Sequence, residues 1–98
     1  MKNILKTVGT QRLLLDNTVK KLTLPQTAVE ALLVLEAEGT AKAARWWTDG
    51  SEPTASEGML LGDASVLELT HRQDLERFQI IGIDPGKTSV LTITYYGF

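Results

Sequence analysis

The feature that most constrains this chain is the spacing of its turn signals, which divide the sequence into short apolar segments about 8 to 12 residues apart. The strongest break is residues 49–58, where Asp49-Gly50, Pro53 and Gly58 follow a segment that ends in two tryptophans. Near the other end of the chain, residues 91–96 alternate between apolar and hydroxyl-bearing side chains, as a half-buried strand does. This pattern favours a hairpin-rich β-sandwich over an active-site cradle.

We expect an all-β fold, a small antiparallel β-sandwich of jelly-roll-like or barrel-like form. It should contain about seven or eight short strands and at most one helical turn. Residues 3–8 are read as an edge strand or arm that ends in a turn at Gly9-Thr10. The other expected strands are residues 12–15, 19–24, 29–37, 43–48, 59–61, 65–70, 79–83 and 89–96, and residues 72–78 form the helical turn.

Two of these segments need an argument beyond composition. Residues 29–37 contain good helix formers, but their context favours a strand that returns as a hairpin through residues 39–42. In the returning arm, Ala44 and Trp46 would share one face of the strand, with Arg45 and Trp47 on the other. In the last strand, the alternation places Leu91, Ile93 and Tyr95 on one face.

The chain length predicts a single domain over residues 1–98, with residues 1–10 as an N-terminal arm or edge strand. The absence of cysteine means that packing must supply the stability. Ten basic and twelve acidic residues are mixed along the chain without a basic block, which argues against nucleic-acid binding. The sequence contains no signal-peptide core and no apolar run long enough to span a membrane, so we expect synthesis in the cytoplasm.

The sequence offers few residues for catalysis or for cofactor and metal binding. His71 is the only histidine, and nothing in the spacing of the hydroxyl groups builds a triad around it. Asp49, Ser51 and Glu52 could hold calcium through their oxygens, but they lack the spacing of an EF-hand, and turn formation with capping by Thr54 or Ser56 is favoured. We therefore predict no enzyme, no cofactor and no metal.

Other charged residues are expected to be surface groups. A glycosidase pair would require two carboxylates that face each other across a cleft, for which a chain of this length has little room. The lysines are scattered, and no phosphate-binding glycine motif is present. The carboxylates considered are Glu36, Glu38, Asp63, Glu68 and Asp74.

Aromatic residues are the better candidates for a functional site. If Trp46 is part of the core, Trp47 lies on the opposite face, where it is either an interface anchor or covered by a loop. Tyr96 and Phe98, beside Gly97, are either packed back or inserted into a neighbouring molecule. Together with Ile4 and Leu5 of the N-terminal arm, Trp47, Tyr96 and Phe98 form our predicted protein interface.

The order of several motifs resembles a family of small β-sandwich proteins of tailed bacteriophages and prophages. The resemblance covers residues 31–96, about two thirds of the chain. Trp47 departs from the pattern, since a polar or charged residue is expected at its place. The matching segments are residues 36–39, an Arg-aromatic strand leading into Asp-Gly at residues 44–50, Pro-Thr-Ala-Ser at residues 53–56, Gly58-Met59, Gly62-Asp63, residues 78–81 and the closing Leu-Thr-Ile-Thr-Tyr-Tyr run at residues 91–96.

This resemblance implies a structural protein of the virion, and we expect a capsid decoration or cement protein that bridges capsid subunits. Its partners would be the major capsid protein or other virion proteins, on the capsid surface. A homo-oligomer is expected, and a trimer would suit a site of local threefold symmetry. The alternatives are a low-copy collar, connector, tail or fibre protein, a carbohydrate-binding module that uses Trp47 and a neighbouring aromatic residue as a sugar platform, and a small hydrolase.

Overall fold

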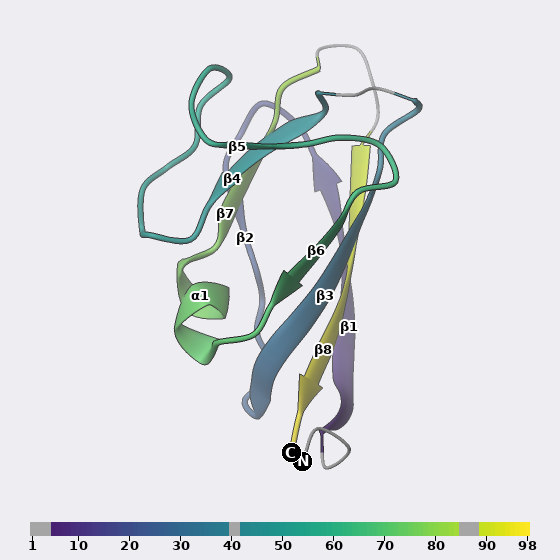
Figure 1. Ribbon diagram of the computed structural model, residues 1–98, viewed down its shortest axis with the longest axis vertical. Helices are drawn as coiled ribbons and strands as arrows, with labels where there is room; N and C mark the ends of the chain where they lie inside the picture. Colours follow the sequence, from purple (N-terminus) through teal and green to yellow (C-terminus); the bar gives the residue numbers. More distant parts are fainter. Residues whose placement is uncertain (1–4, 40–41, 85–88) are drawn as a thin grey trace.

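The computed structural model describes residues 5–39, 42–84 and 89–98. Within these residues the chain forms two four-stranded sheets and one short helix, with the first and last described residues at the same end of the molecule (Figure 1). The strands are β1 (Lys6–Leu15), β2 (Lys20–Lys21), β3 (Ala28–Glu36), β4 (Ala44–Trp47), β5 (Met59–Leu61), β6 (Val66–Leu69), β7 (Gln79–Gly82) and β8 (Ser89–Gly97), and the helix is α1 (Arg72–Arg77).

The strand order identifies the fold as a jelly roll. One sheet has the order β1-β8-β3-β6 and the other has the order β2-β7-β4-β5, with every pair antiparallel. The first strand therefore pairs with the last, the second with the seventh, the third with the sixth and the fourth with the fifth. The chain is one long antiparallel ribbon, bent back on itself at residues 48–58 and rolled into two layers. This confirms the expected all-β sandwich.

The core lies between the two sheets and follows the alternation of the strands. The last strand buries Leu91, Ile93 and Tyr95, as predicted, and β3 buries alternate residues beside them. On the opposite sheet, Ala44 is fully buried and Trp46 packs against the core, with its ring centroid 5.9 Å from that of Phe78. Helix α1 contributes Leu75, which is also buried.

One predicted turn and one predicted hairpin are wrong, and one predicted strand is shorter than expected. The chain does not turn at Gly9-Thr10, because β1 continues from Lys6 to Leu15 and takes up the irregularity as a register shift between Thr7 and Gly9. A Cβ at Gly9 would lie 2.9 Å from the Pro25 side chain, so the glycine permits a close approach there. The structure also does not contain the hairpin through residues 39–42, because β3 and β4 belong to different sheets. The expected strand 19–24 is reduced to Lys20–Lys21.

A part-buried hydrogen bond joins β1 to β8, and a second bond to the same acceptor joins β1 to the segment that follows β2. The hydroxyl group of Tyr95 donates to Gln11 Oε1, and the backbone N–H of Thr23 donates to the same oxygen at 3.0 Å. Both lone pairs of the Gln11 carbonyl are therefore used. Burial of Tyr95 raises its pKa to about 12, because the phenolate would lose its hydration.

Replacement of Tyr95 by Phe should lower the free energy of unfolding by about 1 kcal/mol, the usual net value of one hydrogen bond. Gln11 Oε1 keeps its bond from Thr23, which limits the loss. Tyr96→Phe is the matched control, since Tyr96 lies one residue further along on the opposite face. Urea denaturation at neutral pH measures both variants, and equal losses would contradict a role for the Tyr95 hydroxyl.

The raised pKa of Tyr95 also predicts a loss of stability in alkali. The unfolded chain releases the phenolic proton near pH 10, whereas the folded protein holds it to about pH 12. The free energy of unfolding should therefore fall as the pH rises between these two values. The Tyr95→Phe variant should lose this part of the pH dependence and Tyr96→Phe should keep it, as measured by urea midpoints at a series of pH values.

Candidate interaction surface

The outer face of the β2-β7-β4-β5 sheet is held against a loop of its own chain. Arg45 projects from β4 on this side, and its Nε and Nη1 donate to the carbonyl oxygens of Ala55 and Gly58 at 3.2 and 2.7 Å. Gln79 of β7 donates through Nε2 to the carbonyl oxygens of Gly50 and Ser51 at 3.1 and 3.2 Å. Pro53, in the middle of the loop, is fully buried. Residues 48–58 thus act as a structural cover.

Local turns give this loop its shape. Asp49 Oδ1 accepts a hydrogen bond from the backbone N–H of Ser51 at 2.9 Å, and this bond lowers the pKa of Asp49. Thr54 Oγ1 accepts from the backbone N–H groups of Ser56 and Glu57. These contacts confirm the predicted turn and capping chemistry. In the described part of the chain, no three acidic or histidine residues lie together as metal ligands would.

No loop in the described part of the chain covers the outer face of the other sheet in the same way. Its strands β1, β8, β3 and β6 point alternate side chains away from the core, and two of the apolar ones, Leu14 and Val66, are 61% and 60% exposed. The register aligns the outward residues in rows across the sheet. We call the sheet β1-β8-β3-β6 sheet A, and this set of residues its outer face. The set consists of Thr10, Arg12 and Leu14 from β1, Val90, Thr92, Thr94 and Tyr96 from β8, Glu30, Leu32, Val34 and Glu36 from β3, and Val66 and Glu68 from β6.

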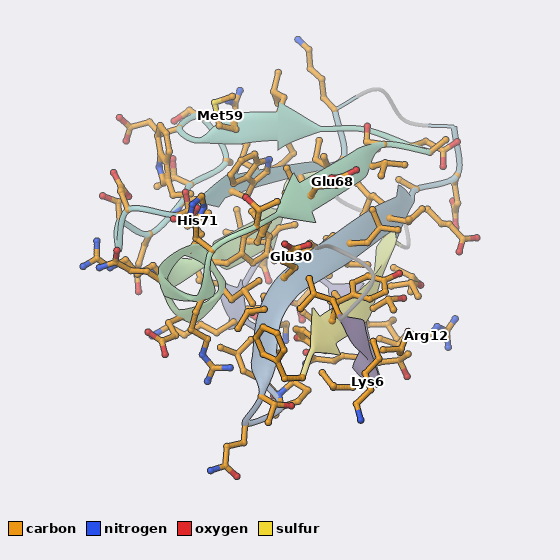
Figure 2. The ribbon with its side chains drawn as sticks, turned by 60° about the horizontal axis from the view of Figure 1, so that its bottom comes forward. Lys6, Arg12, Glu30, Met59, Glu68 and His71 are labelled. Carbon is orange, nitrogen blue, oxygen red and sulfur yellow. The ribbon has the colours of Figure 1, made fainter. Side chains whose placement is uncertain are left out.

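This face combines apolar and β-branched side chains with a basic residue on β1 and acidic residues on β3 and β6. Leu32, Val34 and Val90 are half-buried by their neighbours within the sheet. Arg12 lies on the margin formed by β1, whereas Glu30 and Glu68 lie towards β3 and β6 (Figure 2). None of these three takes part in an ion pair with another described residue. A surface of this composition is suited to contact with another protein.

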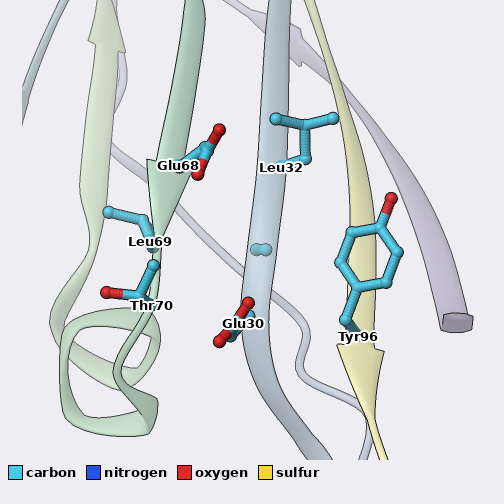
Figure 3. Close-up of a pocket in the computed structure, with 7 residues that line it drawn as sticks. Glu30, Leu32, Glu68, Leu69, Thr70 and Tyr96 are labelled. Atoms are coloured by element: carbon cyan, nitrogen blue, oxygen red, sulfur yellow. The ribbon is translucent and has the colours of Figure 1, made fainter. Parts of the chain in front are cut away.

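A shallow hollow of about 210 Å³ lies between β3 and β6 on the same face. The ring of Tyr96 stands on one side of it, and the carboxylates of Glu30 and Glu68 lie nearby (Figure 3). Ala31, Leu32, Leu69 and Thr70 form the rest of its lining. An aromatic ring with hydrogen-bonding groups beside it can hold a small polar ligand.

The structure separates the predicted interface residues into two places. Tyr96 lies on the outer face of sheet A between Thr7 and Glu30. Leu5 and Phe98 each lie one position beyond the Lys6–Gly97 pair at the same end of the sheet, and Phe98 is 62% exposed. Trp47 is half-buried at the end of β4 in the other sheet, and Ile4 lies outside the described residues.

Sequence reasoning missed Leu14, Val66, Arg12 and Glu68 as surface-site residues. The alternation of β1 could have shown Leu14 and Arg12 on the face opposite Leu13 and Leu15, had the strand not been divided at Gly9. Their position beside β8 and β3 depends on pairing between strands that are distant in the sequence, and local patterns do not carry this information.

The surroundings of His71 do not form a catalytic site. Its Nδ1 is 3.3 Å from Thr70 Oγ1 and 3.9 Å from Asp74 Oδ2, and its side chain is 78% exposed. A nucleophile–base–orienter set needs one partner on each ring nitrogen, whereas both neighbours here approach the same atom. His71 instead lies at the N-terminal boundary of α1.

Comparison with protein-family models and with curated proteins finds no match for this chain. The described part of the chain contains no helix of the length and apolar character needed to cross a membrane.

Replacement of Arg45 by Ala should release the loop from sheet β2-β7-β4-β5. Two hydrogen bonds to backbone carbonyls are lost, so the free energy of unfolding should fall by about 1–2 kcal/mol. A protease specific for glutamate should then cut faster after Glu52 and Glu57, which lie in the loop. The control is Arg12→Ala on the other sheet, and cleavage at the wild-type rate in Arg45→Ala would contradict the anchoring role.

Proposed function

We propose that this protein is a structural subunit of a bacteriophage particle, and that its role is that of a capsid decoration or cement protein. The observation that carries the proposal is a small jelly roll whose β1-β8-β3-β6 sheet has exposed apolar side chains on its outer face, Leu14 and Val66 among them, which suit protein contact. Jelly rolls are frequent among viral structural proteins. The sequence resemblance to phage β-sandwich proteins points in the same direction.

A decoration protein acts through differential affinity. A domain that binds only the assembled, expanded shell stabilises it, because binding draws the equilibrium towards that state. The domain must be rigid enough to keep its contact surface in place, and here the hydrogen bonds of Arg45, Gln79 and Gln11 fix the loop and the strands. The partners would be the major capsid protein or other virion proteins.

The terminal end of sheet A and the edge strand β5 are the other places where contacts with the shell are expected. Phe98 is exposed at the first, and Met59 and Leu60 are exposed on the second. An edge strand has free backbone groups on one side and can accept a further strand from a neighbour. The same features would serve a collar, connector, tail or fibre protein, but at a far lower copy number.

Carbohydrate binding is a second candidate function, favoured by the hollow between β3 and β6. Tyr96 could stack on a sugar ring while Glu30, Glu68 and Thr70 accept or donate hydrogen bonds to its hydroxyl groups. This differs from the platform on Trp47 that the sequence suggested, since Trp47 lies on the other sheet. Titration of the isolated domain with a glycan panel, with Tyr96→Ala as the control, tests this candidate.

The copy number in purified virions of the source phage tests the proposed function. Quantitative mass spectrometry should find about one third to one copy of this chain per major capsid protein, as expected for a component that repeats with the lattice. A few copies to some dozens per particle would move the protein to the collar, connector or tail. Absence from particles would overturn the virion role and favour the carbohydrate-binding candidate.

A further inference from the structure

We propose that two copies of this chain pair through the outer faces of their A sheets, around a twofold axis, with Arg12 of each copy beside Glu68 of the partner subunit. The inference rests on the proposed function in one respect: the second copy would occupy this face, and contact with the shell would then fall to the terminal end of sheet A and to β5. It names the occupant of the face, and its test is separate from that of the virion role.

The apolar side chains of the face indicate contact with another molecule. Leu14 and Val66 are more than half exposed, and Leu32, Val34 and Val90 lie between them in the sheet. Five apolar residues on one side of a four-stranded sheet form a patch of the kind that marks an interaction site. The opposite sheet already has its cover in residues 48–58.

The charges on the face show which occupant fits. Arg12 is on β1, at one edge of the sheet, and Glu68 is on β6, at the other edge. Glu30 lies on the same side as Glu68 (Figure 2), on the neighbouring strand β3, which also carries Glu36. The basic residue of the face is therefore at the β1 edge and its acidic residues are on the half formed by β3 and β6, so the two halves are opposite in charge when the face is turned over onto a second copy.

This match is produced by a twofold axis that lies between the A sheets of the two copies and runs roughly along their strands. Such an axis places β1 of one copy over β6 of the other, and β8 over β3. Arg12 and Glu68 lie in neighbouring rows, since Arg12 aligns with Val66 through Thr92 and Val34. Long side chains span such an offset across packed sheets, which cross within about 30° and lie about 10 Å apart. Both ion pairs form at once because the contact is isologous.

The size of the face predicts a dimer of modest affinity. Four strands about 4.8 Å apart and up to about 30 Å long give a flat area on the order of 500 Å². Side-chain relief increases the accessible area towards the about 800 Å² that each partner contributes to a standard interface. Dissociation in the micromolar range is therefore expected.

Charge reversal at the two margins tests the proposal by sedimentation velocity. At about 100 µM and low salt, well above a micromolar dissociation constant, the wild-type chain should sediment as a dimer. Arg12→Glu and Glu68→Arg should each raise the dissociation constant at least tenfold, because each creates two like-charge contacts per dimer. Both side chains are exposed and form no ion pair with another described residue, so the variants should remain folded, as checked by circular dichroism. Lys21→Glu and Glu57→Arg are the matched controls away from the face.

Mixing the two single variants gives the sharpest outcome. Each variant is repulsive towards itself, but in the mixed pair the carboxylate introduced at position 12 of one chain would face the guanidinium introduced at position 68 of the other. At the second margin of that pair, the native Arg12 would face the native Glu68. An equimolar mixture of Arg12→Glu and Glu68→Arg should therefore dimerise, and a chain that carries both substitutions should dimerise alone. Leu14→Asp should weaken the dimer in every background.

Three results would overturn the proposed pairing. These are a monomeric or trimeric wild-type chain, a dimer unaffected by either charge reversal, and a mixture of the two variants that stays monomeric. Virion copy number distinguishes a failure of the pairing from a failure of the virion role. A monomer that is abundant in particles would retain the virion role and overturn the pairing. A dimer that is absent from particles would retain the pairing and overturn the virion role.

Discussion

The structure depends most on the central position of β8 in the first sheet. This strand pairs with β1 on one side and β3 on the other, so the last segment of the chain joins its first and third strands. Its alternation places Leu91, Ile93 and Tyr95 in the core and sends Thr92, Thr94 and Tyr96 outward. The same period-2 pattern that builds the core thus also creates the outer face of sheet A. The hydrogen bond from Tyr95 to Gln11 adds a polar constraint to this pairing, since a slip of one residue would turn the Tyr95 side chain to the outer face and break the bond.

The outer faces of the two sheets differ in whether a loop of the chain covers them. The smaller sheet has short strands, and the bend of the ribbon at residues 48–58 returns across it through the contacts of Arg45 and Gln79. The larger sheet has long strands and no loop of comparable length to place on them in the described part of the chain. In the proposed pair, the second copy would cover it. The exposed Met59 and Leu60 of β5 belong to the other sheet and would remain accessible in the pair.

Local chemistry explains which parts of the fold could be predicted from sequence. The alternation in residues 91–96 and the turn at Asp49-Gly50 are determined by neighbouring residues, and both predictions are confirmed. The turn expected at Gly9 is wrong because a glycine in a strand marks either a turn or a bulge, and only the close approach of Pro25 distinguishes them. The sequence did not reveal that β3 and β4 enter different sheets. For the site, Tyr96 and Phe98 stood out as aromatic residues, whereas Leu14 and Arg12 become notable only when β1 lies beside β8.

A weak twofold contact is compatible with a role on a particle, because copies bound at neighbouring sites of a lattice are at a high local concentration. In the proposed role, each copy is held by its own contact with the shell, and the second copy is then a neighbour at high effective concentration rather than a solute. The outer face of sheet A would remain largely unpaired in dilute solution and would pair on the assembled lattice, where one ion pair forms at each margin. Bridging would then depend on the spacing of neighbouring sites, so the expanded shell would be stabilised only where that spacing allows the two A sheets to meet.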